Sequence, residues 1–193
     1  MANANTPQGL RPVRYASGAP YNGAANTYFV PAADNTALFI GDPVIVAGSA
    51  DANGVPTATR ATAAGGALWT GVVVGIINTP TVTTTYRPAS TACYILVADD
   101  PNLLFEVQED AVGGALAAAD VGLNADLVAG TGSTVTGKSA FQLDTSTKAV
   151  TATLQMRIEG FVQRADNEIG ANAKVLVRNN LPTQTGAAGS LGR

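Results

Sequence analysis

The stretch Leu68-Trp-Thr-Gly-Val-Val-Val-Gly-Ile-Ile77 decides the fold class of this chain, because its β-branched run suits a buried strand. Turn-forming residues break the sequence on either side of it, at Asp51–Gly54 and at Asn78–Pro80. Further short apolar or alternating segments predict strands at Leu38–Val46, Val55–Thr62, Thr81–Thr85, Thr91–Val97, Leu103–Val107, Thr151–Val162 and Ala173–Val177.

Three local signals refine this pattern. The turn Asp99–Asn102 predicts that the strands before and after it form a hairpin. A slip in the alternation at Gly160 predicts a β-bulge. The alanine-rich segment Val112–Ala119 is a candidate for a short helix. The chain is therefore expected to be all-β, a single β-barrel or jelly-roll-like sandwich over residues 34–181 with at most one or two short helices.

The first 33 residues differ in character from the rest. They contain Pro7, Pro12, Pro20 and Pro31, and Arg11 and Arg14 are their only charged side chains. Proline at this density disfavours a regular helix or a central strand. Residues 1–33 are predicted to be a long extended arm that orders against a neighbouring subunit, or alternatively a floppy terminus. Residues 182–193 form a Gly/Ala-rich tail.

The amino-acid composition argues against several classes of function. The chain of 193 residues has no histidine, which rules out Ser-His-Asp, Cys-His and His-metal chemistry. Its single cysteine, Cys93, is expected to be a small buried core residue. A net charge of −3 argues against a nucleic-acid partner. No apolar stretch is long enough to span a membrane, and Met1–Arg14 does not resemble a signal peptide. We expect a soluble protein made in a cytoplasm.

The arm offers a set of partner-binding candidates. Arginine binds carboxylates through paired hydrogen bonds, and tyrosines beside it add stacking surface. We therefore expect the arm to anchor on an acidic partner surface, although the two arginines alone could serve only solubility. The candidate residues are Arg11, Arg14, Tyr15, Tyr21, Tyr28 and Phe29.

A run of acidic residues without any Lys or Arg is the second candidate site. Its central members, predicted to form a partner-facing patch, are Asp99, Asp100, Glu109 and Asp110. Such a run could also bind calcium or supply a pair of catalytic carboxylates. No D-x-[DN]-x-[DN]-G loop is present, so the expectation is a solvated or partner-facing surface with no metal, cofactor or small-molecule substrate.

The segment Gly132–Ser139 matches the phosphate-binding pattern G-x-x-x-x-G-K-[ST]. A working P-loop has a strand before it and a helix beginning at its lysine. The residues that follow Lys138 alternate like a strand, and too few remain to complete a nucleotide-binding sheet. We interpret this segment as a flexible loop between strands.

The order of segments resembles small head proteins of tailed bacteriophages, of the decoration or capsid-cement kind. The residues that carry the resemblance lie in six segments: Gly9–Arg14, Phe39–Val44, Trp69–Gly75, Phe105–Asp110, Glu159–Arg164 and Ala173–Asn180. The resemblance implies a non-enzymatic β-domain on the outside of an icosahedral shell that clamps neighbouring major capsid subunits as a dimer or trimer. It supplies no catalytic residues. A virion or cell-surface β-domain that recognises a receptor or glycan is the alternative.

Overall fold

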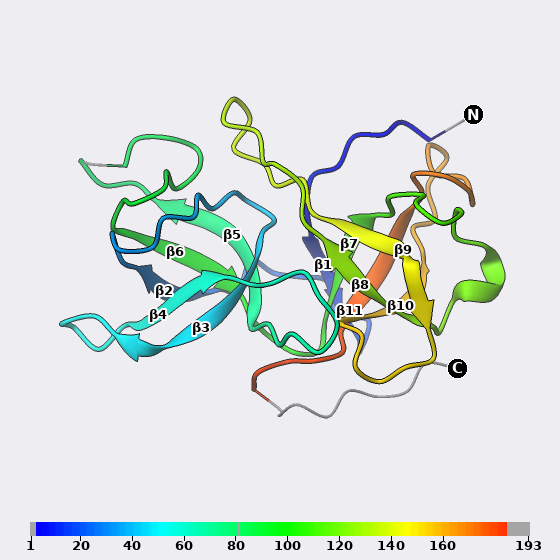
Figure 1. The fold of residues 1–193 in the computed structure, drawn as a ribbon, viewed down its shortest axis with the longest axis horizontal. Coiled ribbons are helices and arrows are strands. Elements are labelled where there is room, and N and C mark those ends of the chain that lie inside the picture. The colour runs from blue at the N-terminus through cyan, green and yellow to red at the C-terminus, as the bar shows by residue number, and fades with distance from the viewer. Residues whose placement is uncertain (1–2, 81, 185–193) are drawn as a thin grey trace.

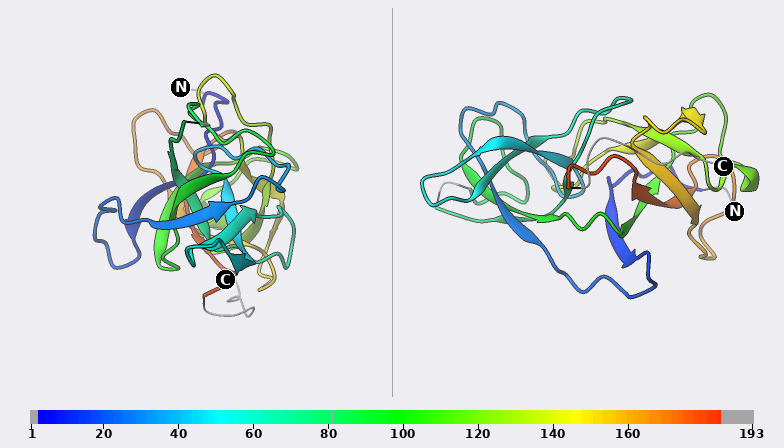
Figure 2. Two further views of the ribbon diagram at one scale, coloured as in Figure 1. Left: turned by 90° about the vertical axis from the view of Figure 1, so that its left-hand side faces the viewer. Right: turned by 90° about the horizontal axis from the view of Figure 1, so that it is seen from below.

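The computed structural model describes residues 3–80 and 82–184, and the chain folds into two β-lobes that lie side by side (Figures 1 and 2). One lobe is a closed barrel with strand order β2-β4-β3-β5-β6. Its strands are β2 (Asn26–Val30), β3 (Pro43–Ala50), β4 (Pro56–Arg60), β5 (Gly71–Ile77) and β6 (Cys93–Ala98). The β-branched run that decided the fold class supplies β5, which pairs with both β3 and β6.

The other lobe is a six-stranded sheet with order β1-β7-β11-β10-β8-β9. Its strands are β1 (Arg11–Tyr15), β7 (Leu103–Gln108), β8 (Asn124–Val128), β9 (Gln142–Ala149), β10 (Met156–Phe161) and β11 (Lys174–Asn179). The sheet curls so far that Glu109, just beyond β7, forms a bridge with Leu143 in β9. A single 3₁₀ turn, η1 (Ala118–Asp120), is the helical element of the described residues.

The all-β prediction is confirmed, and so is the bulge near Gly160, where the register of β10 against β11 shifts. The short helix expected at Val112–Ala119 is reduced to the 3₁₀ turn at its end. The expected hairpin across Asp99–Asn102 is wrong, because β6 and β7 belong to different sheets. Each of these two strands already has neighbours on both sides, so the turn carries the chain from one lobe to the other.

Residues 3–33, the described part of the expected extended arm, do not form such an arm, because β1 and β2 are strands of the sheet and of the barrel, respectively. Pro12 is compatible with β1 because β1 is the edge strand of the sheet, and β7 is its only strand neighbour there. Val30, at the end of β2, is fully buried in the barrel. Burial within the chain itself therefore offsets the entropic cost of ordering much of this segment.

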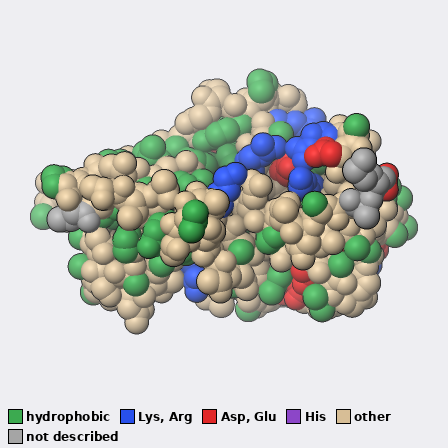
Figure 3. Space-filling view, turned by 90° about the horizontal axis from the view of Figure 1, so that it is seen from above, with side chains coloured by type: hydrophobic (Ala, Val, Ile, Leu, Met, Phe, Trp, Pro, Cys, Tyr) green, Lys and Arg blue, Asp and Glu red, His purple; other side chains and the backbone are tan. Residues whose placement is uncertain are grey.

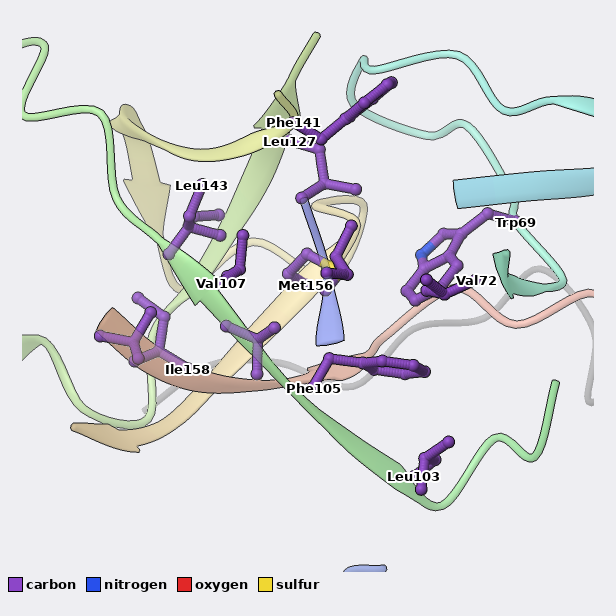
Figure 4. Packing of buried hydrophobic residues seen from close by; sticks show 14 of the residues in the cluster. Trp69, Val72, Leu103, Phe105, Val107, Leu127, Phe141, Leu143, Met156 and Ile158 are labelled. Atoms are coloured by element: carbon purple, nitrogen blue, oxygen red, sulfur yellow. The ribbon is translucent and has the colours of Figure 1, made fainter. Parts of the chain in front are cut away.

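Two apolar clusters stabilise the lobes. The smaller fills the barrel and includes Val44, Ile95 and Val97. The larger lies under the six-stranded sheet, and it also takes in Trp69 and Val72 from the barrel side (Figure 4). The ring of Trp69 packs against that of Phe105 in β7, with 5.6 Å between the ring centroids. The lobes thus share a continuous apolar contact.

Candidate functional site

The strand register determines which side chains of the six-stranded sheet point away from the core. Phe105 in β7 lies opposite Val177 in β11, which lies opposite Ile158 in β10, and all three are buried in the larger cluster. Successive side chains of a strand point to opposite faces, and directly opposed residues share a face. The neighbours of these three residues, among them Glu106 and Arg178, therefore point outward.

The outward side chains of β1, β7, β10 and β11 include several basic residues. Arg11 lies opposite Glu106, Arg178 lies opposite both Leu104 and Arg157, and Lys174 lies opposite Gln108. We call the following set the basic face: Arg11, Arg14, Arg157, Arg164, Lys174 and Arg178, with Glu106 and Glu159 among them. Figure 3 shows Lys and Arg side chains gathered in a band over the lobe that contains the sheet. Six basic and two acidic side chains thus share one face of a chain with 11 basic and 14 acidic residues.

Two carboxylates organise the arginines of the basic face. Glu106 accepts hydrogen bonds from Arg11 at 2.6 Å and from Arg164 at 3.2 Å. On the neighbouring strands, Glu159 lies 3.2 Å from Arg178 and 3.7 Å from Arg157. Each acidic side chain is shared by two basic ones, so the arginines are oriented while the face keeps an excess of positive charge. The side chain of Arg11 is 64% exposed and can reach a partner.

Residues 3–10, here called the N-terminal strap, run along the edge of the basic face. The strap begins at the loop after β10, where the Asn3 side chain donates to the carbonyl oxygen of Glu168. Further on, the Thr6 amide donates to the Gln108 side chain in β7. It ends in the barrel lobe, where the Leu10 amide donates to the Gly41 carbonyl oxygen at 3.0 Å. The strap therefore ties the two lobes together.

A groove of about 160 Å³ lies between the strap and the basic face. Its polar walls include Gln8, Arg11, Glu106, Gln108, Arg164 and Lys174. Three positive charges and one negative charge line this groove, a balance that favours a carboxylate or another anionic group.

The aromatic residues assigned to a partner-binding arm are divided between the two lobes. Tyr28 is buried in the barrel core, and its hydroxyl donates to Asp99 at 2.7 Å. Burial and this bond raise the pKa of Tyr28. Phe29 packs against Tyr94 with 5.1 Å between ring centroids. Tyr15 and Tyr21 are half-buried against the larger cluster. Of the candidate residues, Arg11 and Arg14 are those that the structure brings together on one exposed face.

The four acidic candidates do not lie together. Asp99 and Asp100 precede β7, whereas Glu109 and Asp110 follow it, so the length of that strand separates the two pairs. Glu109 is fully buried, and Asp110 accepts hydrogen bonds from the amide and hydroxyl of Thr145. The predicted acidic patch is wrong as a single surface. Within residues 3–80 and 82–184, no three His, Cys, Asp or Glu side chains lie close enough to hold a metal ion.

The segment Gly132–Ser139 is a loop that closes on itself. The Ser133 amide donates to the Lys138 carbonyl oxygen, and the Gly137 amide donates to that of Ser133. The loop leads through Phe141 into strand β9 rather than into a helix. It therefore lacks the helix N-terminus on which a phosphate-binding loop depends.

Sequence reasoning missed four members of the basic face: Arg157, Arg164, Lys174 and Arg178. A signal for two of them was present in β11, whose sequence Lys174-Val-Leu-Val-Arg178 alternates with its basic ends on one face. Lys174 and Arg178 lie on the same face as Arg11 and Arg14 because β7 pairs with both β1 and β11, and these pairings could not be predicted from the sequence.

Comparisons with family models, curated proteins and solved structures found no match. In the described part of the chain, no helix is long and apolar enough to cross a membrane.

Proposed function

We propose that this protein is a non-enzymatic structural component of a tailed-phage virion, which binds the outside of the icosahedral shell and cements neighbouring major capsid subunits. The observation that carries the proposal is the basic face on a chain of net negative charge. An exposed sheet face with oriented arginines fits a large acidic protein surface better than it fits a small substrate. The resemblance of the sequence to phage head decoration proteins is the reason for proposing that this surface belongs to the capsid shell.

The basic face replaces the extended arm as the proposed contact. Arg11 and Arg14 keep their role, but they act from an edge strand together with four basic side chains of the same lobe. Exposed charge pairs contribute little one by one, about 0–1 kcal/mol each. Repetition over many copies and, in a dimer or trimer, over linked subunits converts weak contacts into a large total stabilisation. The protein would be made in the host cytoplasm and would reside on the outer capsid surface.

Co-sedimentation with capsids that lack the protein tests this proposal. The variant Arg11→Gln/Arg14→Gln removes two positive charges from the basic face and is expected to weaken binding about tenfold or more. The control Ala52→Glu/Val150→Glu changes the net charge by the same amount at exposed positions outside the basic face, and it should bind like the wild type. Binding should also weaken as salt is added, because salt screens exposed charges.

Two results would refute the proposal. In the first, the wild-type protein fails to sediment with capsids at low salt. In the second, the control variant loses as much binding as the arginine variant, which would make net charge rather than the basic face responsible.

A further inference from the structure

An apolar hollow of about 280 Å³ lies where the strap, the segment following β1 and the barrel meet. It is lined by residues from both lobes, most of them apolar: Leu10, Pro12, Tyr21, Ile40, Val73 and Val74. A hollow with apolar walls is the kind of site that takes one large apolar side chain of a partner as an anchor.

The hollow adjoins the groove of the basic face. Gln8 and Arg11 line both, so the two cavities share a wall formed by the strap and β1. A single extended segment can therefore place an apolar side chain in the hollow while its neighbouring residues lie along the groove.

The rim of the hollow is positively charged. Arg11 stands on one side, with its guanidinium on Glu106. Lys138 stands at the rim as well, and its ammonium donates to the neutral side chain of Gln8 at 2.7 Å. Among the residues that the structure describes, no carboxylate pairs with Lys138. Its charge is therefore available to an incoming anion.

We infer that the hollow and the groove together bind an extended acidic segment of the shell protein that carries one large apolar side chain. This inference deepens the proposed function and rests on it for the identity of the partner. The apolar side chain fills the hollow, and carboxylates on either side of it contact Lys138 and Arg11. Apolar burial supplies the anchor and the paired charges fix its direction.

In this arrangement Glu106 competes with the incoming carboxylate for the guanidinium of Arg11. It occupies Arg11 in the free protein, and it also binds Arg164. An incoming carboxylate can take Arg11 while Glu106 keeps Arg164, so its charge does not become unpaired. Removal of the Glu106 charge should therefore strengthen binding of an acidic segment, whereas loss of a purely structural ion pair would not.

Fluorescence anisotropy with labelled nonapeptides tests the inference on the full-length protein. The probe peptide has a central phenylalanine flanked by two glutamates on each side. One control peptide has alanine in place of the phenylalanine, and another has glutamine in place of each glutamate. Both controls should bind about tenfold more weakly than the probe. Arg11→Gln/Lys138→Gln should weaken probe binding by a similar factor, and Glu106→Gln should strengthen it about threefold.

Amide chemical shifts should map the probe to Val73, Val74 and Tyr21, and circular dichroism should show that each variant remains folded. Equal binding of the phenylalanine and alanine peptides, or shift changes confined to other surfaces, would overturn the inference. Capsid binding without peptide binding would refute this site and leave the proposed function standing. Peptide binding without capsid binding would retain the site and refute the proposed function.

Discussion

Replacement of Arg87 by methionine is expected to destabilise the barrel lobe strongly, because the buried guanidinium of Arg87 donates four hydrogen bonds to backbone carbonyl oxygens. Its Nε donates to the carbonyl oxygen of Thr91 at 2.7 Å. Its two terminal nitrogens donate to the carbonyl oxygens of Pro31, Asp34 and Thr36. The side chain is 0% exposed, so water does not reach these groups.

The magnitude follows from the groups left behind. A hydrogen bond to a charged group contributes about 1.5–3 kcal/mol, and a buried carbonyl without a donor carries a further cost. Arg87→Met removes four hydrogen bonds and the positive charge 3.7 Å from the Asp34 carboxylate. The carbonyl oxygens of Pro31 and Asp34 each keep a backbone amide donor, so the cost of a lost donor falls mainly on those of Thr36 and Thr91. A loss of about 4 kcal/mol or more is expected even if each bond contributes only about 1 kcal/mol net. That is a large part of the 5–15 kcal/mol typical of a domain.

Urea denaturation followed by fluorescence measures this loss, since Trp69 is the single tryptophan and is buried. A loss of about 4 kcal/mol corresponds to a fall in Tm of about 8–16 °C for a chain of this length. Arg87→Lys is the matched control. It keeps the charge but lacks the planar guanidinium, so its stability should lie between that of the wild type and that of Arg87→Met. A loss below about 1 kcal/mol for Arg87→Met would refute the reasoning, because it would mean that the four lost hydrogen bonds are replaced at little cost.

Three further predictions concern the buried groups of both lobes. Burial raises the pKa of Glu109 above its usual 4.5, so the folded state should lose stability as the pH rises from 4.5 through that raised pKa. Glu109→Gln should flatten this part of a urea-denaturation pH profile, and an unchanged profile would contradict it. Gly41 has a φ of +98°, and an added Cβ would lie 2.7 Å from the Gln8 carbonyl oxygen, so Gly41→Ala should cost about 1–3 kcal/mol in the same denaturation assay. Cys93 is buried and its thiol pKa is raised by burial, so a thiol-reactive dye should label it only after unfolding; rapid labelling of the native protein would be inconsistent with this structure.

Local sequence patterns predicted most of the strands. The β-branched run became β5, and the alternating segment near residue 160 became β10 with its bulge. These signals depend on the side chains and turns of a single segment, so they can be read without knowing its neighbours. The N-terminal segment was different: its prolines indicated an arm, but an edge strand tolerates Pro12 because one side of that strand needs no donor.

The candidate site was predictable only in part. Arg11 and Arg14 stand close together in the chain and were identified there, while the acidic residues on either side of β7 were grouped by sequence proximity and proved to be separated. A β-strand rises by about 3.3 Å per residue, so residues at its two ends lie far apart in space. Closeness in the sequence is therefore a poor guide to a shared surface.

Local sequence patterns alone indicated an all-β chain and the approximate positions of β3, β4, β5, β6, β7, β10 and β11, because strand propensity and turn chemistry are local. The division of those strands between two lobes, and the outward side chains that lie together, follow from the three-dimensional packing. β7 pairs with β1 on one side and with β11 on the other, and this pairing places Arg11 beside Glu106 and Lys174 beside Gln108. Pairings between residues so far apart in the chain are chosen by burial of the shared core, and that choice depends on all strands at once.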